Sequence, residues 1–240
     1  MNLDNYSRIV NDRSRELEKS HSFPLLMRKV YTWMTMALVI TAITAHTIGS
    51  SPALVQAIYS NSLPYFIIAG AELGIVFWLS SRLHRMSLFT ATLGFIVFSV
   101  LNGITLGWVF AAYTTASVAQ AFLVTAGTFG VMSLIGFTTK KDLSGIGGIL
   151  MMALIGLIIA TVVNMFFHSS MMNLILSGIG VLIFVGLTAW DTQKIKEMLT
   201  QMPDTGETAQ KIALFGALSL YLDFINLFIY LLRFFGSSRD

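Results

Sequence analysis

The chain has 240 residues, of which 55% are hydrophobic and only 11% are charged, and its mean hydropathy is +0.74. Soluble domains carry about 25% charged residues, so the long uncharged apolar runs indicate transmembrane helices and exclude an ordinary soluble core. The absence of cysteine excludes disulfides, thiolate metal sites and a cysteine nucleophile. The net charge of +3 is typical of Lys and Arg at membrane edges and does not indicate a nucleic-acid partner.

The first 24 residues are polar and densely charged, and they lack the apolar stretch and cleavage site of a signal peptide. We predict that residues 1–24 form a polar cytoplasmic tail and that the first apolar run acts as its own insertion signal. Residues 25–236 then form one transmembrane domain, and residues 237–240 form a short carboxyl-terminal tail.

Seven apolar runs follow the tail, each long enough to cross a hydrocarbon core. Their approximate bounds are 30–48, 64–80, 88–112, 118–138, 146–167, 172–192 and 211–233. The link at 112–117 is only mildly polar, so the count falls to six if it does not reach the surface. The predicted fold class is therefore an all-α membrane protein with seven transmembrane helices. The expected surrounding of these helices is the lipid bilayer.

Basic residues fall on alternate connections, which sets the predicted orientation. Besides the tail, these connections carry the pairs Arg82 with Arg85, Lys140 with Lys141, and Lys194 with Lys196. The positive-inside rule then places the amino terminus in the cytoplasm and, with seven spans, the carboxyl terminus outside. Arg233 and Arg239 near the end argue mildly against this orientation.

Two aspartates stand out because a carboxylate costs roughly 2.5–3.5 kcal/mol at the centre of a membrane helix. Asp223 follows Lys211 by twelve residues, about 18 Å along a helix axis, and so lies near mid-membrane. Asp191 ends the sixth run. The two acids can meet if the sixth helix continues past Asp191 through Ile195 and Met198, which follow it on one face.

Two carboxylates that meet in a low-dielectric interior are expected to share a proton and to titrate as a unit. Full ionisation would separate the helices or capture a cation. Calcium takes 6–8 oxygen ligands, which Asp191, Asp223, Asn226, backbone carbonyls and water would supply only in part. We therefore expect weak, pH-dependent calcium binding suited to a pathway, with calcium and protons as the partners and no cofactor.

Three further charged side chains are candidates for a supporting or gating role. Glu72 lies inside the second run and is expected to line a polar interior. Arg82 and Arg85 at the end of that run are possible counter-ions for Asp191, so that protonation of the acid would release a latch. Purely structural interpretations remain open. Asp191 is then a charge at the membrane interface, the buried acids are structural hydrogen-bonding groups, and the arginines only set the orientation.

Several stretches around these acids resemble the signatures of the Bax inhibitor-1 family, the transmembrane Bax-inhibitor-motif proteins. The matching stretches are Gly216–Phe228 with Leu231–Arg233, Phe184–Ile195 and Thr138–Gly145. The family usually has tyrosine where Trp190 stands here. The likeness covers the chain from Leu25 to Gly236, and the short tails are closest to the bacterial branch.

This resemblance implies a seven-helix bundle whose last helix is surrounded by the other six. It also implies a pH-sensitive calcium leak controlled by the two aspartates, which by motif match are Asp191 and Asp223. Arg82 is a looser match as the partner of Asp191, because Arg85 is equally near. A bacterial member is expected in the cytoplasmic (inner) membrane.

Other functions use the same acids. An intramembrane aspartyl protease also places one Asp on each of two consecutive spans, but Asp223 lies in Leu-Tyr-Leu-Asp and lacks a Gly-x-Gly-Asp context. We therefore do not expect an enzyme. A proton-coupled ion exchanger and a non-transporting modulator of a membrane protease or stress response, acting through a membrane-protein partner, stay open.

Overall fold

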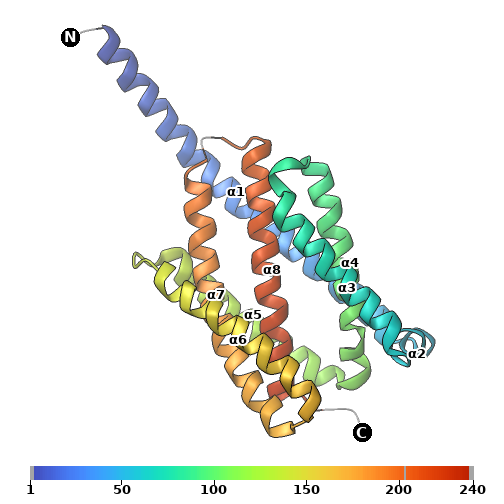
Figure 1. Ribbon diagram of the computed structural model, residues 1–240. Helices are drawn as coiled ribbons and strands as arrows, with labels where there is room; N and C mark the ends of the chain where they lie inside the picture. The colour runs from blue at the N-terminus through green and yellow to red at the C-terminus, as the bar shows by residue number, and fades with distance from the viewer. Residues whose placement is uncertain (1–2, 203, 238–240) are drawn as a thin grey trace.

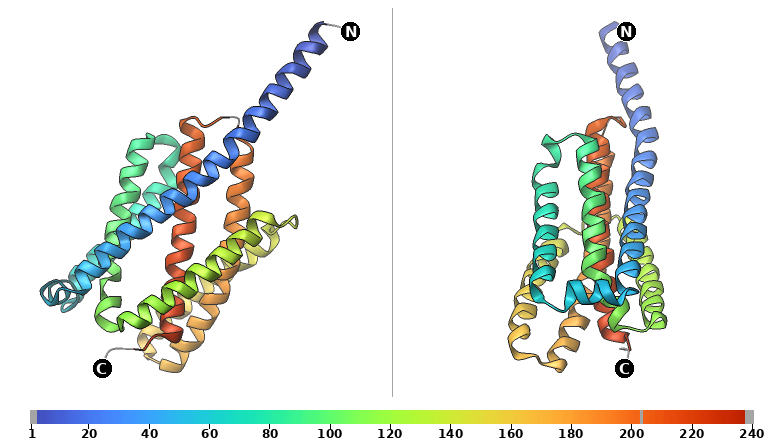
Figure 2. Two further views of the ribbon diagram at one scale, coloured as in Figure 1. Left: turned by 180° about the vertical axis from the view of Figure 1, so that it is seen from behind. Right: turned by 90° about the vertical axis from the view of Figure 1, so that its right-hand side faces the viewer.

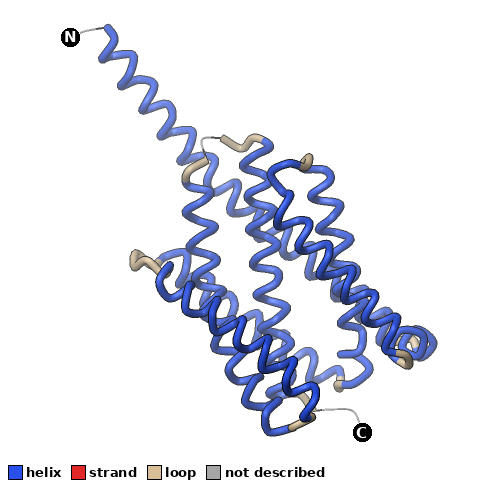
Figure 3. Tube along the Cα trace, in the orientation of Figure 1, coloured by secondary structure: helices blue, strands red, loops and turns tan. Residues whose placement is uncertain are grey.

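The computed structural model describes residues 3–202 and 204–237, and the regular elements of this part are helices (Figure 1, Figure 3). In chain order they are α1 (Leu3–Gly49), α2 (Pro52–Tyr59), α3 (Ser62–Arg82), the 3-10 turn η1 (Leu83–Arg85), α4 (Leu88–Ala112), α5 (Thr115–Thr138), α6 (Ser144–Phe167), α7 (Ser170–Thr200) and α8 (Glu207–Phe235). Seven of them are long and apolar enough to cross a membrane, which confirms the predicted number of spans within the described residues.

The doubtful link between the third and fourth spans does reach the surface. Only Tyr113 and Thr114 separate α4 from α5, and the Thr114 hydroxyl accepts a hydrogen bond from the Ser117 amide at 3.2 Å. This N-cap satisfies one of the free amides at the start of α5. The turn therefore ends one helix and begins the next, and six spans are excluded.

Several helices extend beyond the predicted apolar runs. The sixth run was predicted to end near residue 192 and the seventh to begin near residue 211, but α7 continues to Thr200 and α8 begins at Glu207. Lys, Glu and Gln are good helix formers, so these segments continue the helix outside the apolar part. Likewise α1 is continuous from Leu3, and no break separates the predicted tail from the first span, which begins at Ser22.

The last helix is the core of the bundle. Of the most apolar window of α8, 67% of residues are buried, compared with 6% in α3 and 11% in α6. Helices α1, α4, α5 and α7 make the main contacts with α8, whereas α3 packs on α4 and α6 packs on α7 (Figure 1, Figure 2). This arrangement confirms the predicted enclosure of the last helix.

The bundle has two distinct ends. We call the end that carries η1 and the connections 139–143 and 201–206 the basic end, because Arg85, Lys140 and Lys141 lie there. We call the other end, with α2, the α4–α5 and α6–α7 turns and the end of α8, the carboxyl-terminal end (Figure 1).

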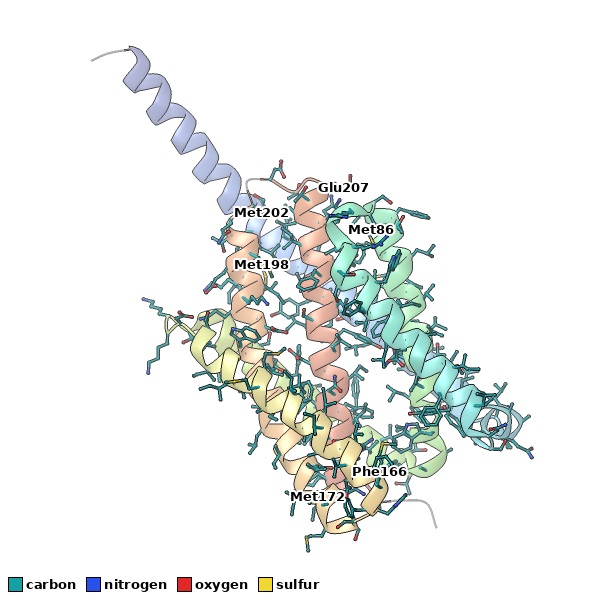
Figure 4. The ribbon with its side chains drawn as sticks, viewed as in Figure 1. Met86, Phe166, Met172, Met198, Met202 and Glu207 are labelled. Carbon is teal, nitrogen blue, oxygen red and sulfur yellow. The ribbon has the colours of Figure 1, made fainter. Side chains whose placement is uncertain are left out.

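Helix α8 is tied to its neighbours at both ends. At the basic end, Glu207 Oε1 accepts a hydrogen bond from the Leu88 amide at 3.1 Å, and Lys211 Nζ donates to the Met86 carbonyl at 3.1 Å. Figure 4 shows Glu207 and Met86 together at this end. Just past the other end of α8, the Ser237 amide donates to Ser117 Oγ at 3.1 Å.

Glycines permit close approach of α5 and α7. A Cβ on Gly136 would collide with the backbone of Ala189, whereas a Cβ on Gly130 of the same helix would meet nothing within 4 Å. We expect Gly136→Ala to destabilise the fold by about 1–3 kcal/mol through overpacking. Gly130→Ala is the matched control and should be neutral or stabilising by about 0.5–1 kcal/mol. Thermal unfolding of both variants in detergent micelles measures the difference, and equal melting temperatures would contradict this packing.

Candidate functional site

The two aspartates lie on neighbouring antiparallel helices. A Cβ on Gly216 of α8 would come within 2.9 Å of the Ile195 side chain, and a Cβ on Gly180 of α7 would come within 2.6 Å of the Tyr230 ring. Asp191 and Asp223 both lie between these two points of close approach. The register therefore sets the two acids at similar height, and the continuation of α7 past Asp191 agrees with what the sequence argument required.

The carboxylate of Asp223 is buried, and one of its oxygens lacks a hydrogen-bond partner among the described residues. The residue is 4% exposed, and the unpartnered atom is Oδ2. Asp191 is partly buried, and its charge interacts with that of Asp223. A buried carboxylate is stable only when it is neutral, paired or bound to a cation. The structure thus brings the two acids together, while their role stays a prediction.

Few positively charged side chains lie near Asp191. Lys194 is one turn away and interacts with the Asp191 charge, but its Nζ lies over the Trp190 ring, 4.9 Å from the centroid. Within the described part of the chain, Asp191 makes no ion pair. The Trp190 ring packs where Gly147 of α6 leaves room.

The other predicted residues do not join this pair. Arg82 and Arg85 are exposed at the end of α3 and in η1, and α3 packs mainly on α4 and α2. The structure therefore gives the expected arginine latch no contact with Asp191 in the described residues. Asn226 donates its amide hydrogen to the Leu222 carbonyl of its own helix at 2.8 Å.

Glu72 belongs to a separate polar network. Its carboxylate accepts hydrogen bonds from Asn102 Nδ2 and, at 2.8 Å, from Thr105 Oγ1, both on α4. The other atom of the Asn102 amide, Oδ1, accepts from the Tyr221 hydroxyl at 3.0 Å. Tyr221 Oη also lies 2.6 Å from Thr41 Oγ1 on α1. One hydrogen-bonded chain therefore connects α3, α4, α8 and α1.

Sequence reasoning missed the centre of this network. Tyr221 is fully buried, and its ring stands edge-on to Phe95 and Phe98 at 5.7 Å between centroids. The signal in the sequence was the polar character of Asn102 and Thr41 inside apolar runs, since buried polar groups in membrane helices require partners. The sequence does not show which helices face each other, so the partners of these polar side chains could not be predicted.

A second, smaller network lies next to Asp191. Ser133 Oγ on α5 is 2.6 Å from the Tyr31 hydroxyl of α1 and 3.2 Å from Thr192 Oγ1 of α7. Thr192 is the residue after Asp191. These hydroxyls position the α7 segment that carries the acid, because interhelical hydrogen bonds fix helix rotation in an apolar environment.

Removal of the Tyr221 hydroxyl tests the larger network. We expect Tyr221→Phe to destabilise the fold by about 1–3 kcal/mol, because Asn102 Oδ1 and Thr41 Oγ1 lose a buried partner. Tyr113→Phe is the control, since its hydroxyl makes no hydrogen bond within the described residues. Melting curves of the two variants in the same detergent measure the difference in stability. A Tyr221→Phe curve that matches the Tyr113→Phe curve would contradict a stabilising role of the Tyr221 hydroxyl.

Comparison with known proteins agrees with this architecture. The family model described as "Inhibitor of apoptosis-promoting Bax1" matches residues 24–240. The chain is 46% identical to the inner membrane protein YbhL of Escherichia coli over 215 residues, 89% of this chain and 92% of the relative. A Rickettsia prowazekii protein is 39% identical over 235 residues, 98% of this chain and 99% of the relative. The chain, an integral membrane protein, therefore belongs to the Bax inhibitor-1 family.

Proposed function

We propose that this protein is a pH-sensitive calcium leak channel controlled by Asp191 and Asp223. The observation that carries the proposal is the buried Asp223 carboxylate, which has an unpartnered oxygen and lies on the enclosed helix α8. A second carboxylate on α7 is near enough for its charge to act on the first. Such intramembrane acids usually mark ion or proton pathways.

The protonation of the pair provides the control. When one proton is shared, the pair carries a single negative charge and the helices stay together. When both acids ionise, they repel each other in the low dielectric and attract a cation. Because deprotonation adds negative charge to the path, calcium flux should rise as pH rises through the titration of the pair.

Calcium is proposed as a permeant ion and not as a resident cofactor. Two carboxylates supply few of the 6–8 oxygen ligands that calcium prefers, so water must complete the shell. Partial coordination favours rapid release, which suits conduction better than storage. We likewise propose a conduit and no catalytic role for the two acids.

The membrane and the orientation are also part of the proposal. YbhL, the Escherichia coli relative, is named an inner membrane protein, and we propose the same bacterial location for this chain. The connections at the basic end contain Lys and Arg, which supports a cytoplasmic position for that end and for the amino terminus.

The test is calcium flux into vesicles that contain the purified protein. Flux of the unmodified protein should increase several-fold from mildly acidic to mildly alkaline buffer. Asp223→Asn and Asp191→Asn should each flatten this pH response, because only one titratable carboxyl remains. Asp142→Asn is the matched control, since Asp142 is an exposed acid on the α5–α6 connection.

Two outcomes would contradict the proposal. If both intramembrane variants keep the flux and pH response of the unmodified protein, the pair does not control conduction. If a proton-sensitive dye reports protons moving against calcium in a fixed ratio, the protein is an exchanger and not a leak.

A further inference from the structure

A wide apolar cleft lies between α1 and α5, and the proposed function leaves it unexplained. Both helices pack against α8, and they contact each other through side chains such as Tyr31 of α1 and Ser133 of α5. In the left view of Figure 2 the α8 ribbon is visible between the ribbons of α1 and α5. The cleft has a volume of about 470 Å³, and its floor consists of Phe224, Ile225 and Phe228 of α8.

The lining of this cleft suits hydrocarbon and not water. Phe224, Ile225 and Phe228 are 5%, 7% and 9% exposed, so they contribute a nearly closed floor. Beside them, Leu123 of α5 lines the cleft and is 69% exposed, which marks the opening toward the lipid-facing surface. A wholly apolar cavity does not hold water, and at this depth the surrounding medium is acyl chains.

The carboxyl-terminal end of the cleft is polar. A second cavity of about 490 Å³ shares Phe110 and Thr115 with the cleft and is also lined by His46 and Ser50. His46 stands edge-on to the Phe110 ring at 5.4 Å between centroids. These residues lie where the spans of α1 and α5 end or begin, at the depth of lipid headgroups.

We propose that this cleft binds one acyl chain of a phospholipid from the leaflet at the carboxyl-terminal end, with the headgroup beside His46 and Ser50. The apolar chamber and its polar mouth together match an amphiphile whose chain enters sideways from the bilayer. The opening is continuous with the lipid-facing surface of α5, so no protein segment has to move to admit the chain. The inference is independent of calcium conduction.

The position of the site gives the bound chain a route to the functional residues. Thr41, which contacts Tyr221 in the larger polar network, also lines the cleft. Phe224 on the floor is the residue after Asp223. A chain in the cleft therefore packs against the α8 segment that carries the buried acid.

Photolabelling tests the site directly. The full chain is placed in nanodiscs with a phospholipid that carries a diazirine near the end of one acyl chain, irradiated, digested and mapped by mass spectrometry. Lipids that merely surround the protein reach only exposed residues. The proposal therefore predicts labels on the enclosed α8 segment 224–228 as well as on exposed α5.

Filling the cleft should abolish the α8 labels. Ala42→Trp and Ala119→Trp place bulk in the cleft from α1 and α5 respectively, so each should lower labelling of 224–228 several-fold. Ala153→Trp on the exposed surface of α6 is the matched control and should leave it unchanged. Melting curves confirm that each variant is folded. Because the two substitutions lie on different helices, the second still tests the proposal when the first does not fold.

Each remaining outcome overturns the proposal. Labels confined to exposed residues such as Leu123 would show an empty cleft, and α8 labels that persist in both filled variants would show another entry route. A diazirine fatty acid without a phosphate headgroup serves as the second probe. Equal labelling of 224–228 by this probe would assign the cleft to free fatty acids and not to phospholipids.

Discussion

The enclosure of α8 is the constraint on which the rest of the structure depends. The acyl chains of lipids cannot hydrogen-bond a polar group, so a carboxylate at mid-membrane depth needs a helix whose polar positions are shielded from lipid. Helices α1, α4, α5 and α7 provide that shield. The small residues at their contacts, such as Gly216 against Ile195, let the shield close tightly. Asp223 is tolerable only because of this arrangement.

The buried polar groups divide into two kinds. Tyr221, Asn102, Thr41 and Glu72 are joined in a network in which each group has a partner, so the network fixes how four helices are rotated about one another. Asp223 keeps a free carboxylate oxygen. A satisfied network resists change, whereas an unsatisfied acid responds to protons and cations. Helix α8 therefore carries both a fully hydrogen-bonded tyrosine and a carboxylate with an unpartnered oxygen.

Hydropathy was sufficient to predict the seven spans, because the bilayer imposes length and polarity on each run separately. The enclosure of the last helix was predicted only from the family resemblance, because hydropathy does not show which helices contact each other. The pairing of Asp191 with Asp223 could be inferred because Ile195 and Met198 continue the apolar face of α7. Contacts that depend on the rotation of two helices could not be inferred. The Tyr221–Thr41 bond, the isolation of Arg82 from Asp191 and the cleft between α1 and α5 all belong to this class.

The ties at the two ends of α8 have a mechanical consequence. Glu207 and Lys211 fix the start of α8 to the beginning of α4, and the Ser117–Ser237 hydrogen bond fixes its end. These hydrogen bonds oppose a shift of α8 along its own axis. Helix α7 packs on α8 and is also joined to the connection before α6 through Gln193. The acid pair lies where α7 packs on α8, and the cleft lies where α1 and α5 flank α8. Both sites therefore share one central helix that is fixed at its two ends, so a lipid chain that displaced α8 sideways would also change the distance between the two acids.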